Sequence, residues 1–429
     1  MKPGRSAAIL TCALALVAAG CGDDEDGGDS AAGGGEKAAP LTLESAADAT
    51  GTVTYCTGKD TSGDKKAGVE RFTKEFEAQG LSAKLLEFPE SADEQRNQFV
   101  QRQEARSSEC DIFDSDDQWT AEFVSQGWLE DVSAYVDDRK DEFIPASLKA
   151  GAYEGKQWGV PFQADTGLIY YRTDKGEKPP ATWQELYSKA AETDGFVYQG
   201  ASYEGLTVDF LDVALSAGGQ VLSEDGKESA INSPENLAAL QLMVDGIKDG
   251  AAPKAVTTYM EEQARRAFEA GRATYMRNWP YAYTLGQKAP MKGKFDVAPL
   301  PAFEGAGQVG VLGVHNLVIS AYSKNKPGAI KLIDYLTTPE AQVIQSAQYG
   351  RSPTLTEVYE DPEVKKAMPF AAEMKKAIEQ GGVRPQSPVY PQVSAAIYKN
   401  VKQALSGRVS PEEALETADE QINDALAAF

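Results

Sequence analysis

The sequence predicts an α/β protein of two lobes, preceded by an export signal and a flexible tether. After residue 50, short apolar runs with strand character alternate with amphipathic helical patterns, which is the order of parallel strands joined by helical crossovers. About 380 of the 429 residues follow the tether, which is too long a stretch for one core and indicates two lobes.

The first twenty residues have the pattern of a secretory signal. Lys2 and Arg5 are followed by an apolar run, residues 7–19, that is too short to span a membrane as a stable helix. The run ends in Val-Ala-Ala-Gly-Cys21, which resembles the lipobox of bacterial lipoproteins, although the family pattern prefers Leu where this chain has Ala18. We therefore expect residues 1–20 to be a signal peptide and Cys21 to carry a lipid. The alternative is an ordinary signal peptide with an incidental cysteine.

The next segment, residues 21–45, is expected to be a tether, because its Gly, Ser, Ala and acidic residues offer almost nothing to bury. The formal net charge of the chain is −23, which disfavours nucleic acid and anionic lipid as partners. The expected location is the outer face of the cytoplasmic membrane in the cell envelope, with the lipid as the only membrane contact.

The remaining cysteines leave two alternatives open. Cys56 and Cys110 form a disulfide in an exported protein, or their thiols stay apart because one ends a predicted strand and the other begins one. A zinc site is not expected, since His315 is the only histidine and no Cys-x-x-Cys occurs. No metal and no cofactor are predicted.

Strands and helices are assigned in chain order from their periodicity. Strands are expected at 51–56, 83–88, 111–114, 159–162, 167–171 and 310–320. Helices are expected at 65–79, 93–107, 119–126, 182–193, 203–217, 233–249, 326–336 and 411–428, with a further helix starting at 338–340. Residues 163–165 form a polar break between two apolar runs, and a Pro-interrupted turn containing Trp279 and Tyr281 is expected after residues 274–278.

Several motifs then carry a resemblance. The segment Ser-Lys-Asn-Lys-Pro-Gly-Ala-Ile-Lys-Leu-Ile-Asp-Tyr-Leu-Thr-Thr-Pro-Glu-Ala-Gln at 323–342 resembles the signature of family 1 extracellular solute-binding proteins. Companion motifs lie at 180–186, 203–211, 277–283, 390–394 and 404–408, in family order over most of the chain. The chain is similar to the trehalose/maltose-binding branch.

The resemblance implies a periplasmic-binding-protein type II-like fold, in which two discontinuous α/β lobes are joined by a hinge. It implies an N-terminal lobe of residues 46–162 and 313–360 and a C-terminal lobe of residues 163–312 and 361–429. Crossing strands are expected near 163–165, 312–314 and 361. Ligand binds between the lobes, and closure is read by the permease of an ABC importer.

Sugar binding needs carboxylates and amides for hydroxyls and aromatic rings for the C–H faces. Asp116 and Asp117 follow a predicted strand at the edge where α/β sheets bind ligands, and Asp116 matches a hydroxyl-binding carboxylate of the family. The alternative is a helix N-cap. Asp165 matches the second carboxylate, and a charge between apolar runs is costly unless it is paired or used. Gln163 points to the same side of an extended chain, where relatives can carry Tyr.

Trp279 and Tyr281 are the candidate stacking rings, because alternation along an extended chain directs both to one side. The alternative is core packing, which we expect for Trp128 and Trp183. The resemblance adds Arg384 as a donor to hydroxyls, with a surface charge as the alternative. It also adds Gly313 as a backbone position next to the ligand, and it places His315 where the related branch has Trp.

The loop at 58–63 resembles a phosphate loop but lacks the Gly-Lys-Ser/Thr ending. We expect it to offer Asp60, Ser62 and backbone N–H groups to hydroxyls. Arg96, on the helix expected at 93–107 after the second strand, is a further candidate donor.

The sequence thus predicts a monomeric, non-enzymatic sugar receptor whose partners are a disaccharide such as trehalose or maltose and the ABC permease subunits. One alternative is the same receptor fold with a polyamine or peptide as cargo. Another is an exported glycoside hydrolase using Asp116 and Asp165 as acid and base.

Overall fold

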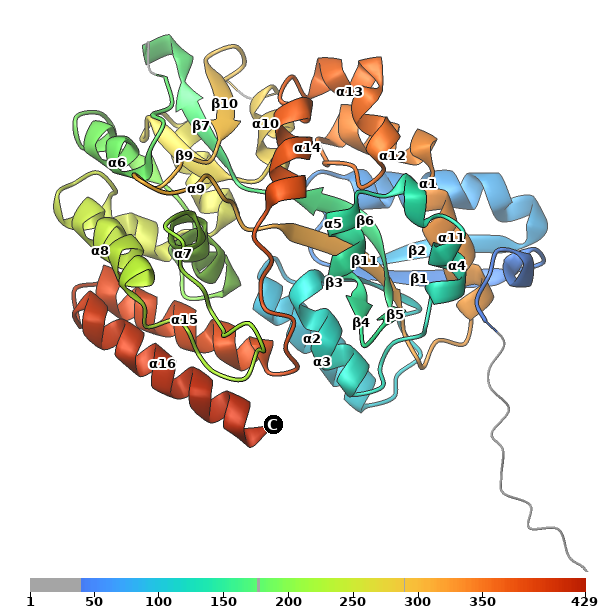
Figure 1. Cartoon of the computed structure of the whole chain (residues 1–429). Coiled ribbons are helices and arrows are strands. Elements are labelled where there is room, and N and C mark those ends of the chain that lie inside the picture. The colour runs from blue at the N-terminus through green and yellow to red at the C-terminus, as the bar shows by residue number, and fades with distance from the viewer. Residues whose placement is uncertain (1–39, 176–177, 289) are drawn as a thin grey trace, which may run out of the picture. The chain divides into compact units, whose positions relative to one another are not determined.

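Two β-sheets carry the fold (Figure 1). The computed structural model describes residues 40–175, 178–288 and 290–429. One sheet has five strands in the order β2-β1-β3-β11-β6, and the other has four in the order β10-β7-β9-β8. A small hairpin adds β4 (Ala152–Tyr153) and β5 (Lys156–Gln157).

The five-stranded sheet begins as a parallel α/β unit. Strands β1 (Gly51–Thr57), β2 (Leu81–Glu87) and β3 (Ile112–Asp116) run parallel, with α1 and α2 as the crossovers. Strand β11 (Gly313–Ile319) then inserts antiparallel between β3 and β6 (Gly159–Asp165). The fourth strand of this sheet, β11, therefore comes from a point in the chain far from its two neighbours.

The helices around this sheet follow the predicted signals closely. In α1, Val69 and Phe72 are buried and Phe76 packs against the core, as the amphipathic pattern predicts. The helices from the first half of this lobe are α1 (Asp64–Phe76), α2 (Ala92–Glu104), α3 (Thr120–Ser125), α4 (Ser133–Asp137) and α5 (Pro145–Ala150). Two helices follow β11, namely α11 (Lys326–Leu336) and α12 (Pro339–Tyr349).

The four-stranded sheet contains strands that the sequence did not reveal. Strand β7 (Leu168–Arg172) was predicted, and it pairs antiparallel with β9 (Tyr275–Asn278) and β10 (Phe295–Pro299). Strand β8 (Phe196–Val197) pairs parallel with β9. Strand β9 was not predicted; it is a buried strand paired on both sides, and the chain turns at Pro280 directly after it.

Helices flank the second sheet, and Figure 1 shows α15 and α16 lying beside α7 and α8. Helix α8 begins as predicted with Ser233 as N-cap and Pro234 at its first position. The helices of this part are α6 (Trp183–Ala191), α7 (Glu204–Ser216), α8 (Pro234–Lys248), α9 (Glu261–Glu269), α10 (Tyr281–Gly286), α15 (Tyr390–Leu405) and α16 (Pro411–Ala428).

Three segments link the two sheets. The first is residues 166–167 between β6 and β7, and the second leads into β11. The third lies beyond α13 (Pro362–Ala367) and α14 (Ala371–Gln380), where Gly382 pairs alongside Val311. Asp361, near which the third crossing was expected, accepts hydrogen bonds from the N–H groups of Glu363 and Val364 and so caps α13. The lobe boundaries given above stay a prediction.

Cys56 and Cys110 form a disulfide, which decides between the two alternatives left by the sequence. Their Cα atoms are 5.8 Å apart although β1 and β3 are parallel neighbours. A bend at Asp111, just before β3 begins, turns Cys110 back toward β1. Both cysteines are buried beside Phe99, Phe113 and other aromatic residues.

The expected signal peptide, the lipidated Cys21 and most of the tether lie outside the described residues. Among the helices of residues 40–429 that the structure describes, none is long and apolar enough to cross a membrane. Trp128 and Trp183 are buried, as predicted.

Candidate functional site

Three predicted site residues lie in one row across the five-stranded sheet. The register pairs His315 of β11 with Asp116 of β3 on one side and with Gln163 of β6 on the other. Side chains of paired residues point to the same face of a sheet. The next pair on this face joins Gly313 to Asp165. The strand ends therefore gather predicted residues that are about 150 positions apart in the chain on a single edge.

Asp165 is the most constrained carboxylate of this edge. It is only 4% exposed, and it accepts a hydrogen bond from the side-chain amide of Gln163, which in turn accepts one from Arg351. Its other oxygen, Oδ1, has no hydrogen-bond partner. Burial raises the pKa of Asp165, and the neighbouring polar side chains of Ser352 and Gln163 oppose that rise. A buried acceptor without a partner is costly, so it is well suited to receive a ligand hydroxyl.

His315 lies between two carboxylates. Its Nδ1 is 2.9 Å from Oδ1 of Asp114, and its Nε2 is 3.9 Å from Oδ1 of Asp116. Burial lowers the pKa of His315, but Asp114 and Asp116 more than compensate, so the pKa is raised. Burial also raises the pKa of Asp114, yet Lys65 and His315 hold it well below its usual range. Asp114 thus stays ionised and fixes both the imidazole and the Lys65 ammonium.

The two candidate rings come from a different part of the fold. Trp279 directly follows β9, and Tyr281 begins α10. Both side chains line the same cavity, but strand alternation is not the reason, because the chain has turned into a helix between them. The Tyr281 hydroxyl donates to Glu262 over 3.0 Å, and the Trp279 carbonyl accepts from the Tyr170 hydroxyl over 2.7 Å.

Arg384 reaches the site, but its guanidinium is already engaged. Nη1 donates to Glu204 over 2.8 Å and Nη2 donates to Asp117 over 2.5 Å, while Nε has no hydrogen-bond partner. Burial raises the pKa of Glu204 to about 7, although Arg384 and Ser394 act in the opposite direction. Arg384 is therefore neither the surface charge nor a fully free donor. Arg384 thus links Asp117, which directly follows β3, to Glu204, which begins α7.

Two predicted residues lie outside the site. The Asp60 carboxylate accepts from the backbone N–H groups of Gly63 and Lys66 and so caps the start of α1, which leaves it turned away from the cavity. Arg96 forms a bidentate ion pair with Glu122 of α3. The structure therefore does not bring either residue into the wall of this cavity. Ser62, which is bonded weakly to Asp60, does line the cavity.

The other predicted residues share one cavity of about 220 Å³. Its lining comes from the edge of the five-stranded sheet on one side, and from the segment after β9 and the helices α7, α9 and α10 on the other. The predicted residues in its wall are Ser62, Asp116, Gln163, Asp165, Trp279, Tyr281, Gly313, His315 and Arg384. The wall thus combines carboxylates, an amide, a guanidinium and two rings, which is the set that a polyhydroxyl ligand requires.

The sequence analysis missed part of this wall. The residues it did not assign include Lys59, Lys65, Glu90, Tyr203, Glu204, Glu261, Glu262 and Arg351. Tyr203 and Glu204 begin a motif that was recognised, so their position at a helix start was an available signal. Glu261 and Glu262 begin α9, a helix that was not predicted, and Arg351 follows α12 through a glycine turn. These residues are brought to the cavity only by tertiary packing.

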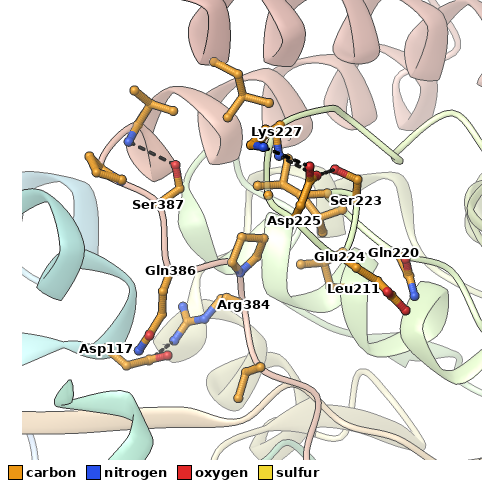
Figure 2. Close-up of a pocket in the computed structure, with 18 of the residues that line it drawn as sticks. Asp117, Leu211, Gln220, Ser223, Glu224, Asp225, Lys227, Arg384, Gln386 and Ser387 are labelled. Carbon is orange, nitrogen blue, oxygen red and sulfur yellow. Dashed lines mark hydrogen bonds and ion pairs between the residues drawn. The ribbon is translucent and has the colours of Figure 1, made fainter. Parts of the chain in front are cut away.

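A second and larger cavity, of about 930 Å³, contains few of the predicted residues (Figure 2). Arg384 lines both cavities, so segment 383–389 separates them. The charged side chains of this cavity are largely bonded to each other, as Asp225 is to Ser223 and Lys227. Its wall includes Val383 and Phe429, two of the most exposed large apolar residues of the described part. The smaller cavity contains Asp165, whose Oδ1 has no hydrogen-bond partner, and most of the predicted residues. We therefore assign the candidate site to the smaller cavity.

Within the described part of the chain, no cluster of three or more His, Cys, Asp or Glu side chains has the arrangement to hold a metal ion.

Comparisons with known proteins agree with this architecture. A family model described as bacterial extracellular solute-binding protein matches residues 60–343. A probable ABC transporter-binding protein of Deinococcus radiodurans is 33% identical over 407 residues, which cover 90% of this chain and 94% of that protein.

Two solved structures extend the likeness to the fold. The maltose-bound MalE3 of T. maritima aligns with a TM-score of 0.83 and 36% identity, covering 87% of this chain and 99% of the other. An ABC transporter solute-binding protein of Thermotoga lettingae, bound with α-D-tagatose, aligns with a TM-score of 0.80 and 25% identity, covering 88% and 100%. The predicted type II-like fold of two α/β lobes is confirmed. The chain belongs to the bacterial extracellular solute-binding proteins.

Proposed function

We propose that this chain is the substrate-binding subunit of an ABC importer, which captures a sugar in the cavity between its lobes and delivers it to the permease. In this role the protein is a monomer and carries out no chemistry on its ligand. Closure of the lobes around the ligand is the state that the permease recognises, because ligand contacts are better satisfied when both lobes make them.

One observation carries the proposal. The cavity of about 220 Å³ has carboxylate and amide groups of the five-stranded sheet and rings from the segment after β9 in its wall, and the buried Asp165 presents an oxygen without a partner. A ligand hydroxyl would satisfy that oxygen, and the C–H faces of a sugar ring would cover Trp279 and Tyr281.

The cargo that we propose is a disaccharide of the trehalose or maltose type. The 36% identity to a maltose-bound relative supports this class. His315 and Gln163 make part of the wall polar where the related branch carries rings, so hydroxyl contacts replace stacking there. We expect the linkage preference to depend on these two positions.

Calorimetric titration tests the proposal most directly. Protein lacking residues 1–40 is unfolded and refolded to remove any bound ligand, then titrated with maltose, trehalose, a monosaccharide, a polyamine and a short peptide. Tight 1:1 binding of a disaccharide alone supports the assignment, and the elution volume on gel filtration reports whether the protein is monomeric. Tight binding of the polyamine or peptide alone would refute the sugar assignment but keep the receptor role.

The glycoside hydrolase alternative has its own readout. Incubation of the protein with maltose or trehalose should release no glucose, because the relatives are binding proteins and Asp116 and Asp165 serve as hydrogen-bond acceptors in our assignment. Release that is lost in an Asp165→Asn variant would establish an enzyme instead.

We also propose that a lipid on Cys21 anchors the protein to the outer face of the cytoplasmic membrane. The support is the Val-Ala-Ala-Gly-Cys sequence at 17–21 and the acidic, Gly-rich segment after it. In cells, a Cys21→Ser variant should move from the membrane fraction to the soluble exported fraction, whereas Cys12→Ser should not. A wild-type protein found wholly in the soluble fraction would contradict the anchor.

A further inference from the structure

Arg277 lies directly behind one of the ligand-facing rings. Its guanidinium carbon is 4.1 Å from the centroid of the Trp279 ring, which is the geometry of a cation–π stack. Trp279 lines the candidate cavity and is half-buried, whereas Arg277 is 1% exposed and does not line it. The guanidinium therefore covers the side of the indole that faces the protein, and the cavity side stays open.

The guanidinium itself is held firmly by polar groups of the second lobe. Its Nε is 2.9 Å from Asp212 and 3.0 Å from Asp209, both of α7, and Nη1 donates to Gln199 over 3.1 Å. The two aspartates are also buried, and each bonds a backbone N–H. Because planar guanidinium groups lose little entropy in such multiple contacts, this arrangement makes a rigid platform under the ring.

Gly167 provides the space for this platform. A Cβ atom at this position would lie 2.6 Å from Nε and 2.8 Å from Nη2 of Arg277, which is closer than real contacts allow. The backbone of Gly167 has no left-handed φ, so the conformation itself is open to other residues. A side chain at 167 would therefore act on the guanidinium and not on the local backbone.

We infer that Arg277 is a positioning residue that fixes the Trp279 ring for stacking on the ligand, with Gly167 leaving room for its guanidinium. The inference rests on the proposed sugar-binding function, in which Trp279 contacts a C–H face of the sugar. Arg277 itself touches no ligand. Its effect on binding is expected to pass entirely through the indole.

Two substitutions test this inference. Arg277→Lys keeps the positive charge beside Asp209 and Asp212 but removes the planar group, and Gly167→Ala displaces the guanidinium while leaving it in the chain. Each should weaken disaccharide binding about tenfold, the loss expected when a stacked contact is disturbed. The matched controls are Arg172→Lys, where a buried arginine of the neighbouring strand β7 pairs with the exposed Asp174, and Gly307→Ala, at a glycine with open space around it. The controls should bind as the wild type does.

A mutant cycle separates positioning from a general structural role. In a Trp279→Leu background, Arg277→Lys and Gly167→Ala should have no further effect on the dissociation constant, because the ring through which they act is gone. Persistence of the tenfold loss in that background, or equal losses in the two controls, would overturn the inference.

A readout without ligand keeps the inference testable on its own. The difference in fluorescence emission between each protein and its Trp279→Phe partner reports the Trp279 ring, and this difference spectrum should shift in Arg277→Lys and Gly167→Ala but not in the controls. If the wild type binds no sugar while the spectrum shifts as expected, the proposed function fails and the positioning of the ring stands. An unchanged spectrum would refute the positioning role.

Discussion

Asp165 shows at the scale of a single residue how the fold prepares a binding group. Its carboxylate is buried, one oxygen is held by Gln163, and the other has no partner. The surrounding structure bears the cost of this arrangement, and a ligand that donates a hydroxyl would offset it.

We expect Asp165→Asn to weaken sugar binding by about 2 kcal/mol, because an amide replaces a charge-assisted acceptor with a neutral one. The folded protein should lose no stability, since the burial that raises the pKa of Asp165 disfavours its charged form. Calorimetric affinity and the thermal midpoint measure the two effects. A variant that binds normally would remove Asp165 from the site.

His315 predicts a dependence of stability on pH. Its pKa is raised in the folded state, so its contribution is fully present below the unfolded value of about 6.5 and is lost as pH rises through the folded value. Glu204, whose folded pKa is about 7, acts in the same direction, because the native state holds its proton more tightly than the unfolded chain does. The free energy of unfolding should therefore fall as the pH rises from about 4.5 through about 7 because of Glu204, and fall further above about 6.5 because of His315.

Denaturant titrations of the wild type, His315→Gln and Glu204→Gln over this range measure the effect. Each variant should have a shallower slope than the wild type, and the difference from His315→Gln should shrink above pH 8. Since the chain has one histidine, any remaining slope in that variant belongs to carboxyl groups such as Glu204. Equal slopes in all three proteins would contradict the assignment.

At the scale of elements, the loop before α1 contains an acidic residue, Asp60, that stabilises the start of the helix. Asp60 accepts from the N–H groups of Gly63 and Lys66, so it stabilises the first turn instead of meeting a ligand. We expect Asp60→Ala to lower the free energy of unfolding by about 1 kcal/mol, as the loss of a helix cap does. Urea denaturation measures this loss. Asp60→Ala should weaken sugar binding much less than Asp165→Asn does. A larger loss of affinity in Asp60→Ala would show that Asp60 contacts the ligand.

Elements with strong local signals were predictable from the sequence, and elements that depend on neighbours were not. The starts of α8, α12 and α16 were predicted because Ser or Thr caps are followed by Pro. Strand β9 was not, since its four residues are all buried and lack the alternation of a one-sided strand. In the same way, Asp165 and Trp279 could be found from polarity and motif, whereas the pairing of Arg96 with Glu122 depends on how two helices meet.

At the scale of the whole molecule, the disulfide ties β1 to the start of β3. Cys56 and Cys110 are 54 positions apart, and closing a loop of that length restricts the unfolded chain by about 4 kcal/mol in the chain-entropy account. A Cys56→Ala/Cys110→Ala variant should therefore be less stable by an amount of this order, as measured by denaturant unfolding without reductant. When the wild type is unfolded and refolded in the presence of reductant, its free energy of unfolding should equal that of the variant. Identical stabilities with and without the bond would argue that the cysteines are reduced in solution.

The position of β11 has a consequence for biosynthesis. This strand is the fourth in its sheet and separates β3 from β6, yet it is made only after residue 312. While the earlier residues emerge, β3 and β6 have no common neighbour, and the row that joins Asp116, His315 and Gln163 does not exist. The hydrogen-bond ladder of this sheet can consequently be completed only after residues 313–319 have been made, so its last pairing joins segments that are distant in the chain.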